Sequence, residues 1–188
     1  MLTLGLLLGV ENLTVYLMIG SIWNIRGTGK TGRKQALADL IHDHKLEFVG
    51  IVETKCAAFS PHFLNYVAGP WEFTWIELPA NKTAGGILAG IRSDLFDVIS
   101  HRCYKYCLSV IIMDKKVNAV WQLVIVYGTA YYEFKMEFIA ELHDIMDSCV
   151  LPIMFGGDFN LVRSASDKNN GQVNTNWSFL FNDWINKW

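Results

Sequence analysis

The sequence predicts an α/β fold in which two sheets pack face to face and helices cover them. Apolar runs of strand length recur along the 188 residues, several of them in pairs. Segments with apolar residues at helical spacing lie between these runs, an order typical of sheets covered by helices. The hydrophobic fraction is 52% and the charged fraction 18%, which excludes a disordered chain, and the length fits one domain.

The first half of the chain alternates strand and helix patterns. Its four predicted strands are near-continuous apolar runs at residues 15–23, 47–53, 71–78 and 85–92. Between the first two runs, residues 33–44 carry apolar side chains at helical spacing, so we expect a helix there. The segment 79–84 is rich in turn-forming residues and joins the last two strands.

The second half predicts three more strands and two helices. The strands are expected at residues 106–113, 119–128 and 151–160. Residues 133–147 place six apolar side chains on one helical face, namely Phe134, Phe138, Ile139, Leu142, Ile145 and Met146. Residues 176–188 predict a short amphipathic helix at the end of the chain.

Charge and cysteine usage give little sign of a particular partner. A net charge of −2 and a pI near 6.2 lack the basic footprint of many DNA-binding proteins, although carboxylates at a metal site can make a nuclease locally acidic. The four cysteines fit neither a zinc site nor a redox pair, so we expect free and mostly buried thiols in an intracellular protein.

The N-terminus is apolar but does not predict a membrane segment. Residues 1–10 lack a basic flank, Glu11 interrupts the run, and the stretch is too short to span a bilayer. We therefore expect no signal peptide and no membrane association. Residues 1–14 are interpreted as an apolar leader of unclear role, and residues 15–188 as the single domain.

Polar groups stand where four of the apolar runs stop. Asn24 ends the first run, Glu53 the second and Tyr127 a later one, and the run before Asp158 and Asn160 ends in two glycines. Polar side chains at strand ends are a common way to build a site on a rigid scaffold. Each also has a structural interpretation: a turn residue for Asn24, a cap or solvated acid for Glu53, a packing residue for Tyr127.

The pair at the last strand suggests metal-assisted chemistry. Residues two apart in a strand face the same way, so we expect Asp158 and Asn160 to point together and Phe159 to point into the core. Mg²⁺ takes oxygen ligands and keeps several waters, so one or two carboxylates plus a substrate phosphate suffice. Glu53 is then the candidate ligand, and the Asn24 amide can hold phosphate oxygens without adding charge.

Taken in order, several short motifs resemble one family. The motifs are WNIRG (residues 23–27), VETK (52–55), GGIL (85–88), VYG (126–128), and GGDFNLVR with DKNNG (156–171). Their set is similar to the endonuclease/exonuclease/phosphatase superfamily, closest to the apurinic-type endonuclease domain of LINE-like, non-LTR retroelements of plants. The resemblance implies a four-layer α/β sandwich of two mostly antiparallel sheets flanked by helices. It also implies Mg²⁺-dependent hydrolysis of a DNA phosphodiester, with Mn²⁺ as the alternative ion.

The resemblance implies a role for each matched residue. The metal would be held by Glu53 with Asn24 and Asp158, and Asp158 would also orient the attacking water. Tyr127 and Asn160 would contact and stabilise the phosphate. Arg26 and Lys55 flank these motifs and would contact the DNA backbone. As a retroelement endonuclease, the protein would be nuclear.

The chain also departs from the family pattern. Family domains continue into further strands and a Ser-Asp-His motif, whereas this sequence stops at Trp188 and its histidines all precede residue 156. We therefore expect an incomplete second sheet and a C-terminally truncated domain, active with a partner supplying the missing segment or at reduced rate. The alternative is a non-catalytic retroelement remnant that acts at most as a binding module. A branch acting on phosphoinositide or sphingomyelin head groups is the third interpretation, against which DKNNG favours the retroelement branch.

Overall fold

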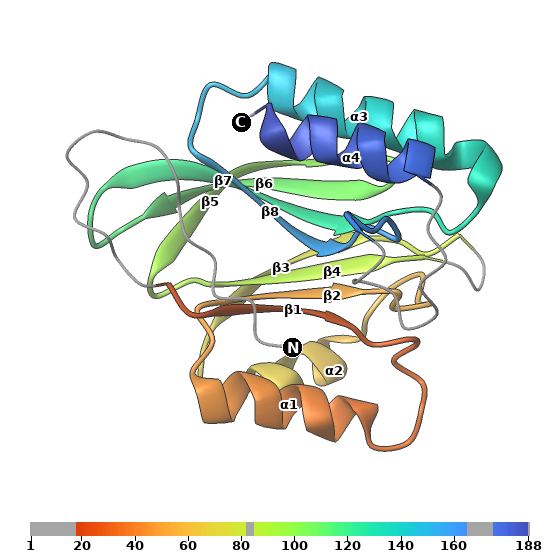
Figure 1. Ribbon diagram of the computed structural model, residues 1–188. Coiled ribbons are helices and arrows are strands. Elements are labelled where there is room, and N and C mark those ends of the chain that lie inside the picture. The colour runs from red at the N-terminus through yellow and green to blue at the C-terminus, as the bar shows by residue number, and fades with distance from the viewer. Residues whose placement is uncertain (1–17, 82–84, 165–174, 188) are drawn as a thin grey trace.

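The computed structural model describes residues 18–81, 85–164 and 175–187. Two sheets pack against each other in the middle of the molecule, and a pair of helices covers each outer face (Figure 1). Helices α1 (Arg33–His44) and α2 (Pro61–Ala68) lie on one side, and α3 (Lys135–Asp147) and α4 (Thr175–Asn186) on the other. The predicted α/β sandwich is therefore confirmed.

The first sheet contains the N-terminal strands in the order β1-β2-β4-β3. Its strands are β1 (Gly20–Asn24), β2 (Phe48–Val52), β3 (Phe73–Leu78) and β4 (Ile87–Arg92). The β1/β2 pair is parallel, with Asn24 opposite Val52, and the other two pairings are antiparallel. Helix α1 makes the crossover that a parallel pair requires.

The second sheet has the order β5-β6-β7-β8. Its strands are β5 (Phe96–Cys103), β6 (Cys107–Asp114), β7 (Ala119–Tyr127) and β8 (Ile153–Asp158). The first two pairings are antiparallel and β7/β8 is parallel, with Tyr127 opposite Asp158. A 3-10 turn, η1 (Tyr132–Phe134), and α3 form the crossover between β7 and β8.

Alternation along the strands divides the apolar side chains between inner and outer cores. In β7, Leu123 and Ile125 face the first sheet, while Val124 and Val126 face α3 and α4. The inner core between the sheets includes Trp121, which is in edge contact with the Phe48 ring at 6.1 Å. These large rings contribute much of the apolar surface buried between the sheets.

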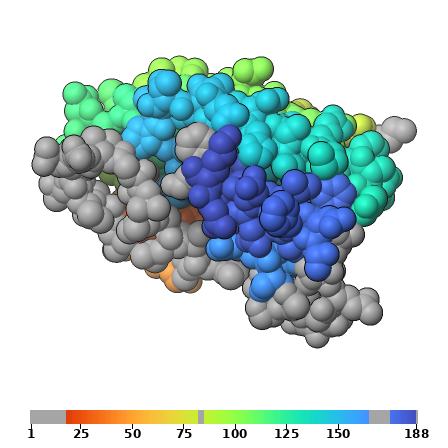
Figure 2. Space-filling view, turned by 45° about the horizontal axis from the view of Figure 1, so that its top comes forward, coloured from red at the N-terminus to blue at the C-terminus, as the bar shows by residue number. Residues whose placement is uncertain are grey.

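The outer helices bury one face each. Leu37 and Ile41 of α1 pack against Val49 and Ile51 of β2 in a core of their own. On the opposite side α3 and α4 lie next to each other over the second sheet, as Figure 2 shows from outside. No helix in the described ranges is both long and apolar enough to cross a bilayer.

Several predicted boundaries were wrong. Of the described residues, 18 and 19 precede the first strand, which starts at Gly20, and the last strand stops at Asp158, two residues early; residues 15–17 of the first predicted run lie outside the described residues. Phe134 is 43% exposed and precedes α3, so it does not belong to the buried helix face. The sequence interpretation missed α2 and β5 altogether. The leader, residues 1–14, and the DKNNG motif, residues 167–171, lie outside the described residues.

Candidate active site

The carboxyl ends of both parallel strand pairs meet at one edge of the sandwich. Asn24 is the last residue of β1 and Glu53 follows β2, while Tyr127 and Asp158 close β7 and β8. Asn24 alternates with Ile22, and Asp158 with Met154, both in the inner core. The two polar side chains therefore project into the mouth between the sheets rather than toward the helices.

The Asn24 amide links the two sheets. Its Nδ2 donates a hydrogen bond of 2.7 Å to Oδ2 of Asp158, across 134 residues of sequence. The same side chain lies close enough to the Glu53 carboxylate to lower its pKa, and its Oδ1 accepts the backbone N–H of Arg26 at 3.1 Å. One amide thus lies beside two carboxylates, one at the end of each sheet, without adding a third negative charge.

Glu53 is held as a carboxylate by neighbouring donors. Burial raises the pKa of Glu53, but hydrogen bonds from Lys55 and Asn24 and the charges of Lys55 and Arg26 outweigh it. The pKa therefore lies below its ordinary value of 4.5. Lys55 Nζ stands 3.1 Å from Oε1 of Glu53, so a cation already sits beside this oxygen.

Tyr127 carries a neutral phenol at the site. Burial and the negative charges of Glu53 and Asp158 raise the pKa of Tyr127 to about 12. The hydroxyl keeps its proton at neutral pH and stays a hydrogen-bond donor. Its interaction with Glu53 places the phenol in the same polar cluster.

Asn160 reaches the site by a different route from the one that strand alternation predicted. The strand has ended at Asp158, and Asn160 adopts a left-handed conformation with φ 50°. Its backbone N–H donates to Oδ1 of Asp158 at 3.1 Å, and its Nδ2 donates to the Gly128 carbonyl at 2.7 Å. The prediction that Phe159 points into a hydrophobic core is confirmed: its ring packs against Phe181 and Trp184 of α4, in the core on the outer face of the second sheet.

Unusual backbone conformations are concentrated at this edge. Six non-glycine residues of the described chain have positive φ, and four of them are Arg26, Glu53, Lys55 and Asn160. A left-handed conformation at such a residue costs about 1–3 kcal/mol and persists where the surroundings enforce it. The strain is therefore gathered where the candidate functional side chains are, which favours a functional role for the edge.

The two glycines before Asp158 solve different packing problems. A Cβ on Gly156 would lie 2.4 Å from Cδ1 of Ile22 in the opposite sheet, so Gly156 lets the sheets approach. Gly157 has φ 146°, and a Cβ there would lie 2.0 Å from the carbonyl oxygen of Val126. Together the glycines bring Asp158 close to both β1 and β7.

The donor set suits a hard divalent cation with few protein ligands. The described residues contain no group of three or more His, Cys, Asp or Glu side chains arranged to hold a metal. Glu53 and Asp158 nevertheless provide two carboxylates beside an amide, and Mg²⁺ commonly uses one or two carboxylates plus water and substrate phosphate. Coordination by Glu53 would require Lys55 to leave the oxygen that it now contacts.

Lys135 is a site-edge residue that the sequence interpretation missed. Its Nζ donates to the Asn160 carbonyl at 2.8 Å and to the Thr129 carbonyl at 3.4 Å. It thereby ties the start of α3 to the loops that follow β7 and β8. The local sequence does not predict these contacts, because Asn160 and Thr129 are 25 and 6 residues away from Lys135 in the chain.

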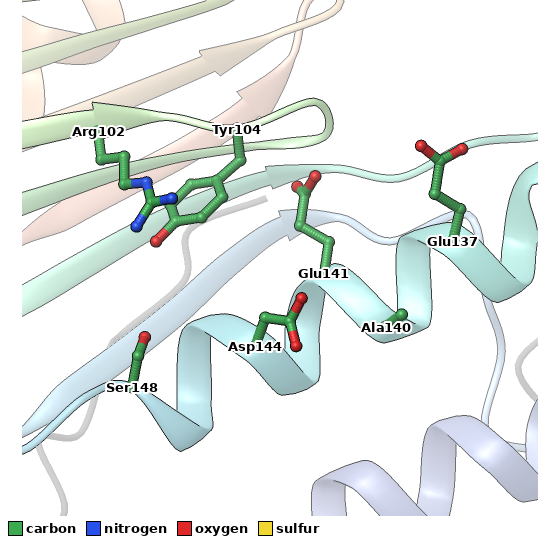
Figure 3. Close-up of a pocket in the computed structure, with 7 residues that line it drawn as sticks. All are labelled: Arg102, Tyr104, Glu137, Ala140, Glu141, Asp144 and Ser148. Carbon is green, nitrogen blue, oxygen red and sulfur yellow. The ribbon is translucent and has the colours of Figure 1, made fainter.

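A groove on the outside of the second sheet is a separate feature (Figure 3). It is lined by Arg102, Tyr104, Glu137, Ala140, Glu141, Asp144 and Ser148. Glu141 accepts the backbone N–H groups of Lys105 and Tyr106 at 3.0 and 2.9 Å, and Glu137 contacts Lys105 Nζ at 2.6 Å. These acids brace the β5–β6 turn, so their cluster has a structural explanation.

The chain belongs to the Endonuclease/Exonuclease/phosphatase family, whose model matches residues 22–188. The matched span contains every candidate site residue described above. No curated protein matches the chain significantly.

Solved structures with the same fold are distant in sequence. The mannosyl-6-phosphatase Bt3783 of Bacteroides thetaiotaomicron VPI-5482 is 13% identical, with a TM-score of 0.58 over 76% of this chain and 65% of that one. The human Nocturnin catalytic domain with bound sulfate is 12% identical, with a TM-score of 0.54 over 74% and 64%. D. rerio TDP2 complexed with a single-strand DNA product is 14% identical, with a TM-score of 0.55 over 75% and 60%. The chain thus spans less than two thirds of the length of each of these structures.

Proposed function

We propose that this protein hydrolyses a phosphodiester bond in DNA with the help of a divalent cation, Mg²⁺ or alternatively Mn²⁺. The observation that carries the proposal is the Asn24 amide, which hydrogen-bonds Asp158 at the end of one sheet and lies beside Glu53 at the end of the other. The sequence motifs around these residues further favour a LINE-like, non-LTR retroelement endonuclease of plants. The structure of TDP2 with its DNA product illustrates that this fold can accommodate a nucleic-acid strand.

The chemistry follows from the charge state of each group. Glu53, with Asn24 and Asp158, would hold the cation, which when bound polarises the phosphoryl group and stabilises charge on the departing oxygen. The Asp158 carboxylate would orient the attacking water and accept its proton. The neutral Tyr127 hydroxyl and the Asn160 amide would donate to phosphate oxygens as negative charge builds up on them. Arg26 and Lys55 are exposed cations beside the cluster and would contact flanking phosphates.

The proton for the leaving oxygen has no histidine donor at the described site. The five histidines lie on α1, α2, β5 and α3, at His42, His44, His62, His101 and His143. A positioned general acid or base contributes about 10²–10⁴-fold in rate. We therefore expect slow cleavage by this chain. The alternative, a binding module without catalysis, is favoured by the same observation.

The test is nicking of supercoiled plasmid by the purified protein, with Mg²⁺, with Mn²⁺ and with EDTA. We expect cation-dependent nicking that falls at least about 10²-fold in Asp158→Asn and in Glu53→Gln, because each removes charge from the cation site. Asp94→Asn is the matched control, since Asp94 pairs with Arg92 outside the site.

Three results would count against the proposal in different ways. Equal nicking by all variants would identify a contaminating nuclease. Nicking in EDTA would exclude a cation-dependent reaction. Folded protein that binds Mg²⁺ through Asp158 but does not nick DNA would establish the binding module instead.

A further inference from the structure

The segment between β7 and α3 presents aromatic rings to solvent beside the candidate site. Tyr131 is 66% exposed, Tyr132 64% and Phe134 43%. Single exposed apolar residues are common on protein surfaces, but three large exposed rings within four positions are not. We refer to Tyr131, Tyr132 and Phe134 as the aromatic patch, and a patch of this kind indicates a binding surface. The patch begins four residues after Tyr127.

The rings are held by the same contacts that shape the site. The Tyr131 backbone N–H donates to Thr129 Oγ1 at 3.1 Å, and Lys135 Nζ bonds to the carbonyls of Thr129 and Asn160. The patch is thereby fixed to the loop that carries Asn160. The Tyr131 hydroxyl also lies near enough to Tyr127 to contribute to the raised pKa of that residue.

Neighbouring rings hold each tyrosine without covering it. Tyr131 meets Phe134 edge-to-face, with ring centroids 6.4 Å apart, and Tyr132 meets Trp177 of α4 at 5.2 Å. Such contacts restrict the rings while about two thirds of each tyrosine stays accessible. A restricted ring loses little further entropy when a flat ligand stacks on it.

The charges beside the patch indicate what the ligand is. Arg26 and Lys55 are exposed cations next to the candidate phosphate site, and Lys135 stands where the patch meets Asn160. Cations that follow a phosphate backbone, with aromatic rings alongside, are how proteins hold single-stranded nucleic acid. In a duplex both faces of each base are already stacked on neighbours, so a ring can stack only on an unpaired base.

We propose that Tyr131 and Tyr132 form a stacking surface for unpaired bases next to the scissile phosphate, which gives the protein a preference for single-stranded or locally unpaired DNA over duplex. Tyr131, the ring nearer to Tyr127, takes the base adjoining that phosphate, and Tyr132 takes the next one. The inference deepens the proposed function and rests on it.

The experiment measures binding separately from cleavage. Fluorescence anisotropy in EDTA compares a labelled 15-nucleotide oligo(dT) with a 15-base-pair duplex, for the full chain and its variants. We expect tighter binding to oligo(dT). Tyr131→Ala lowers that affinity between about 5-fold and 150-fold, the range measured for base–aromatic contacts, and changes duplex affinity less than twofold. Tyr131→Phe keeps the ring and the affinity.

A matched control and a second readout keep the result unambiguous. Tyr66→Ala removes a partly exposed tyrosine from α2, in the opposite outer layer, and leaves both affinities unchanged. Unchanged oligo(dT) affinity in Tyr131→Ala, or an equal loss for oligo(dT) and duplex, overturns the inference. So does a dimer in light scattering that Tyr131→Ala dissociates, because the patch would then bind a second copy.

The two proposals fail in different ways. Loss of plasmid nicking in Asp158→Asn, together with no effect of Tyr131→Ala on oligo(dT) binding, leaves the nuclease and removes the stacking surface. If oligo(dT) binding depends on Tyr131 but no preparation nicks DNA, the stacking surface is supported and the nuclease proposal is rejected.

Discussion

The Asp158 carboxylate is held by one hydrogen bond on each of its oxygens. Its Oδ2 accepts from the Asn24 amide and its Oδ1 from the backbone N–H of Asn160. Hydrogen bonds to an ionised acceptor are about twice as strong as neutral ones, so the carboxylate is fixed in direction. Each oxygen still has lone-pair capacity for water or a cation, which is what a water-orienting acid needs.

Replacing the Asn24 amide by a carboxylate would replace its hydrogen bond to Asp158 by repulsion between two negative charges. In Asn24→Asp two acids share hydrogen-bond distance, so one pKa of the pair is raised in the folded state. The folded protein then binds more protons than the unfolded one, and its stability falls as pH rises through the normal range of aspartate. We expect a loss of about 1–3 kcal/mol at pH 7 relative to wild type.

Thermal unfolding at pH 4 and pH 7, with and without Mg²⁺, measures this effect. Stability of Asn24→Asp should approach that of Asn24→Ala at pH 4, and Mg²⁺ should restore part of it at pH 7. A loss independent of pH and of Mg²⁺ would mean that the two side chains do not interact.

Tyr127 allows a prediction that does not depend on catalysis. Because its pKa is raised to about 12, Tyr127 should ionise well after the exposed tyrosines in an absorbance titration at 295 nm. Tyr127→Phe should remove that late step alone. The raised pKa stabilises the fold up to about pH 10, and this contribution is lost as pH rises toward 12, a loss that Tyr127→Phe should lack.

In the nicking assay, Tyr127→Phe should lower the rate about 10²-fold, as expected for the loss of one donor to a developing negative charge. The pH dependence between 6 and 10 should keep its shape, since the phenol stays neutral throughout. If the wild-type pH–rate profile has a limb between pH 6 and 10 that disappears in Tyr127→Phe, then Tyr127 titrates in that range.

At the scale of strands and helices, the elements with clear local patterns could be predicted. Helix α1 has the predicted bounds because the periodicity of residues 33–44 is complete within the helix itself. Strand β5 was missed because it is an edge strand with mostly exposed residues and a register shift between Val98 and Ser100. Its polar residues interrupt the alternation that predicts a strand.

The candidate site shows the same division between local and distant information. Its residue types at the ends of apolar runs were visible in the sequence. The Asn24–Asp158 link was not, because a contact over 134 residues depends on how two sheets pack. Asn160 was misplaced in conformation, since nothing in the apolar run specified that the strand would end at Asp158 and a left-handed turn would follow.

The glycines of β8 should differ in their tolerance to substitution. Gly157→Ala places its Cβ against the backbone oxygen of Val126, which cannot rotate away, at a positive φ. Gly156→Ala meets the tip of Ile22, a side chain that can change rotamer. We expect a loss of about 3 kcal/mol or more for Gly157→Ala and about 1 kcal/mol for Gly156→Ala, from urea unfolding. Equal losses would mean that β8 shifts as a whole.

At the scale of the whole molecule, neither sheet alone provides all the residues of the candidate site. Asn24 and Glu53 lie at or just after the ends of strands of the first sheet, and Tyr127, Asp158 and Asn160 at or just after the ends of strands of the second. The site therefore exists only while the inner core holds the sheets in register. The outer core under α4 lies on the far face of the second sheet, so we expect it to stabilise that sheet without setting its position relative to the first.

Two core substitutions can separate these contributions. Ile125→Ala leaves a cavity in the inner core behind Tyr127, opposite Gly50 of β2. Trp184→Ala leaves one in the outer core, where Trp184 packs on Phe155. The expected losses are about 2–5 and 3–5 kcal/mol, and each kcal/mol lowers the Tm of a domain of this size by about 2–4 °C.

The decisive comparison is made on folded protein, well below either Tm. Because only Ile125→Ala relaxes the spacing between the sheets, it should weaken Mg²⁺ binding in calorimetry and shift the late tyrosine step toward lower pH, as Tyr127 loses its burial and its acidic neighbours. Trp184→Ala should leave both readouts at their wild-type values despite an equal or greater loss of stability. If both variants weaken Mg²⁺ binding in proportion to their stability, the site follows global stability rather than the register between the sheets, and the division into inner and outer cores has no functional meaning.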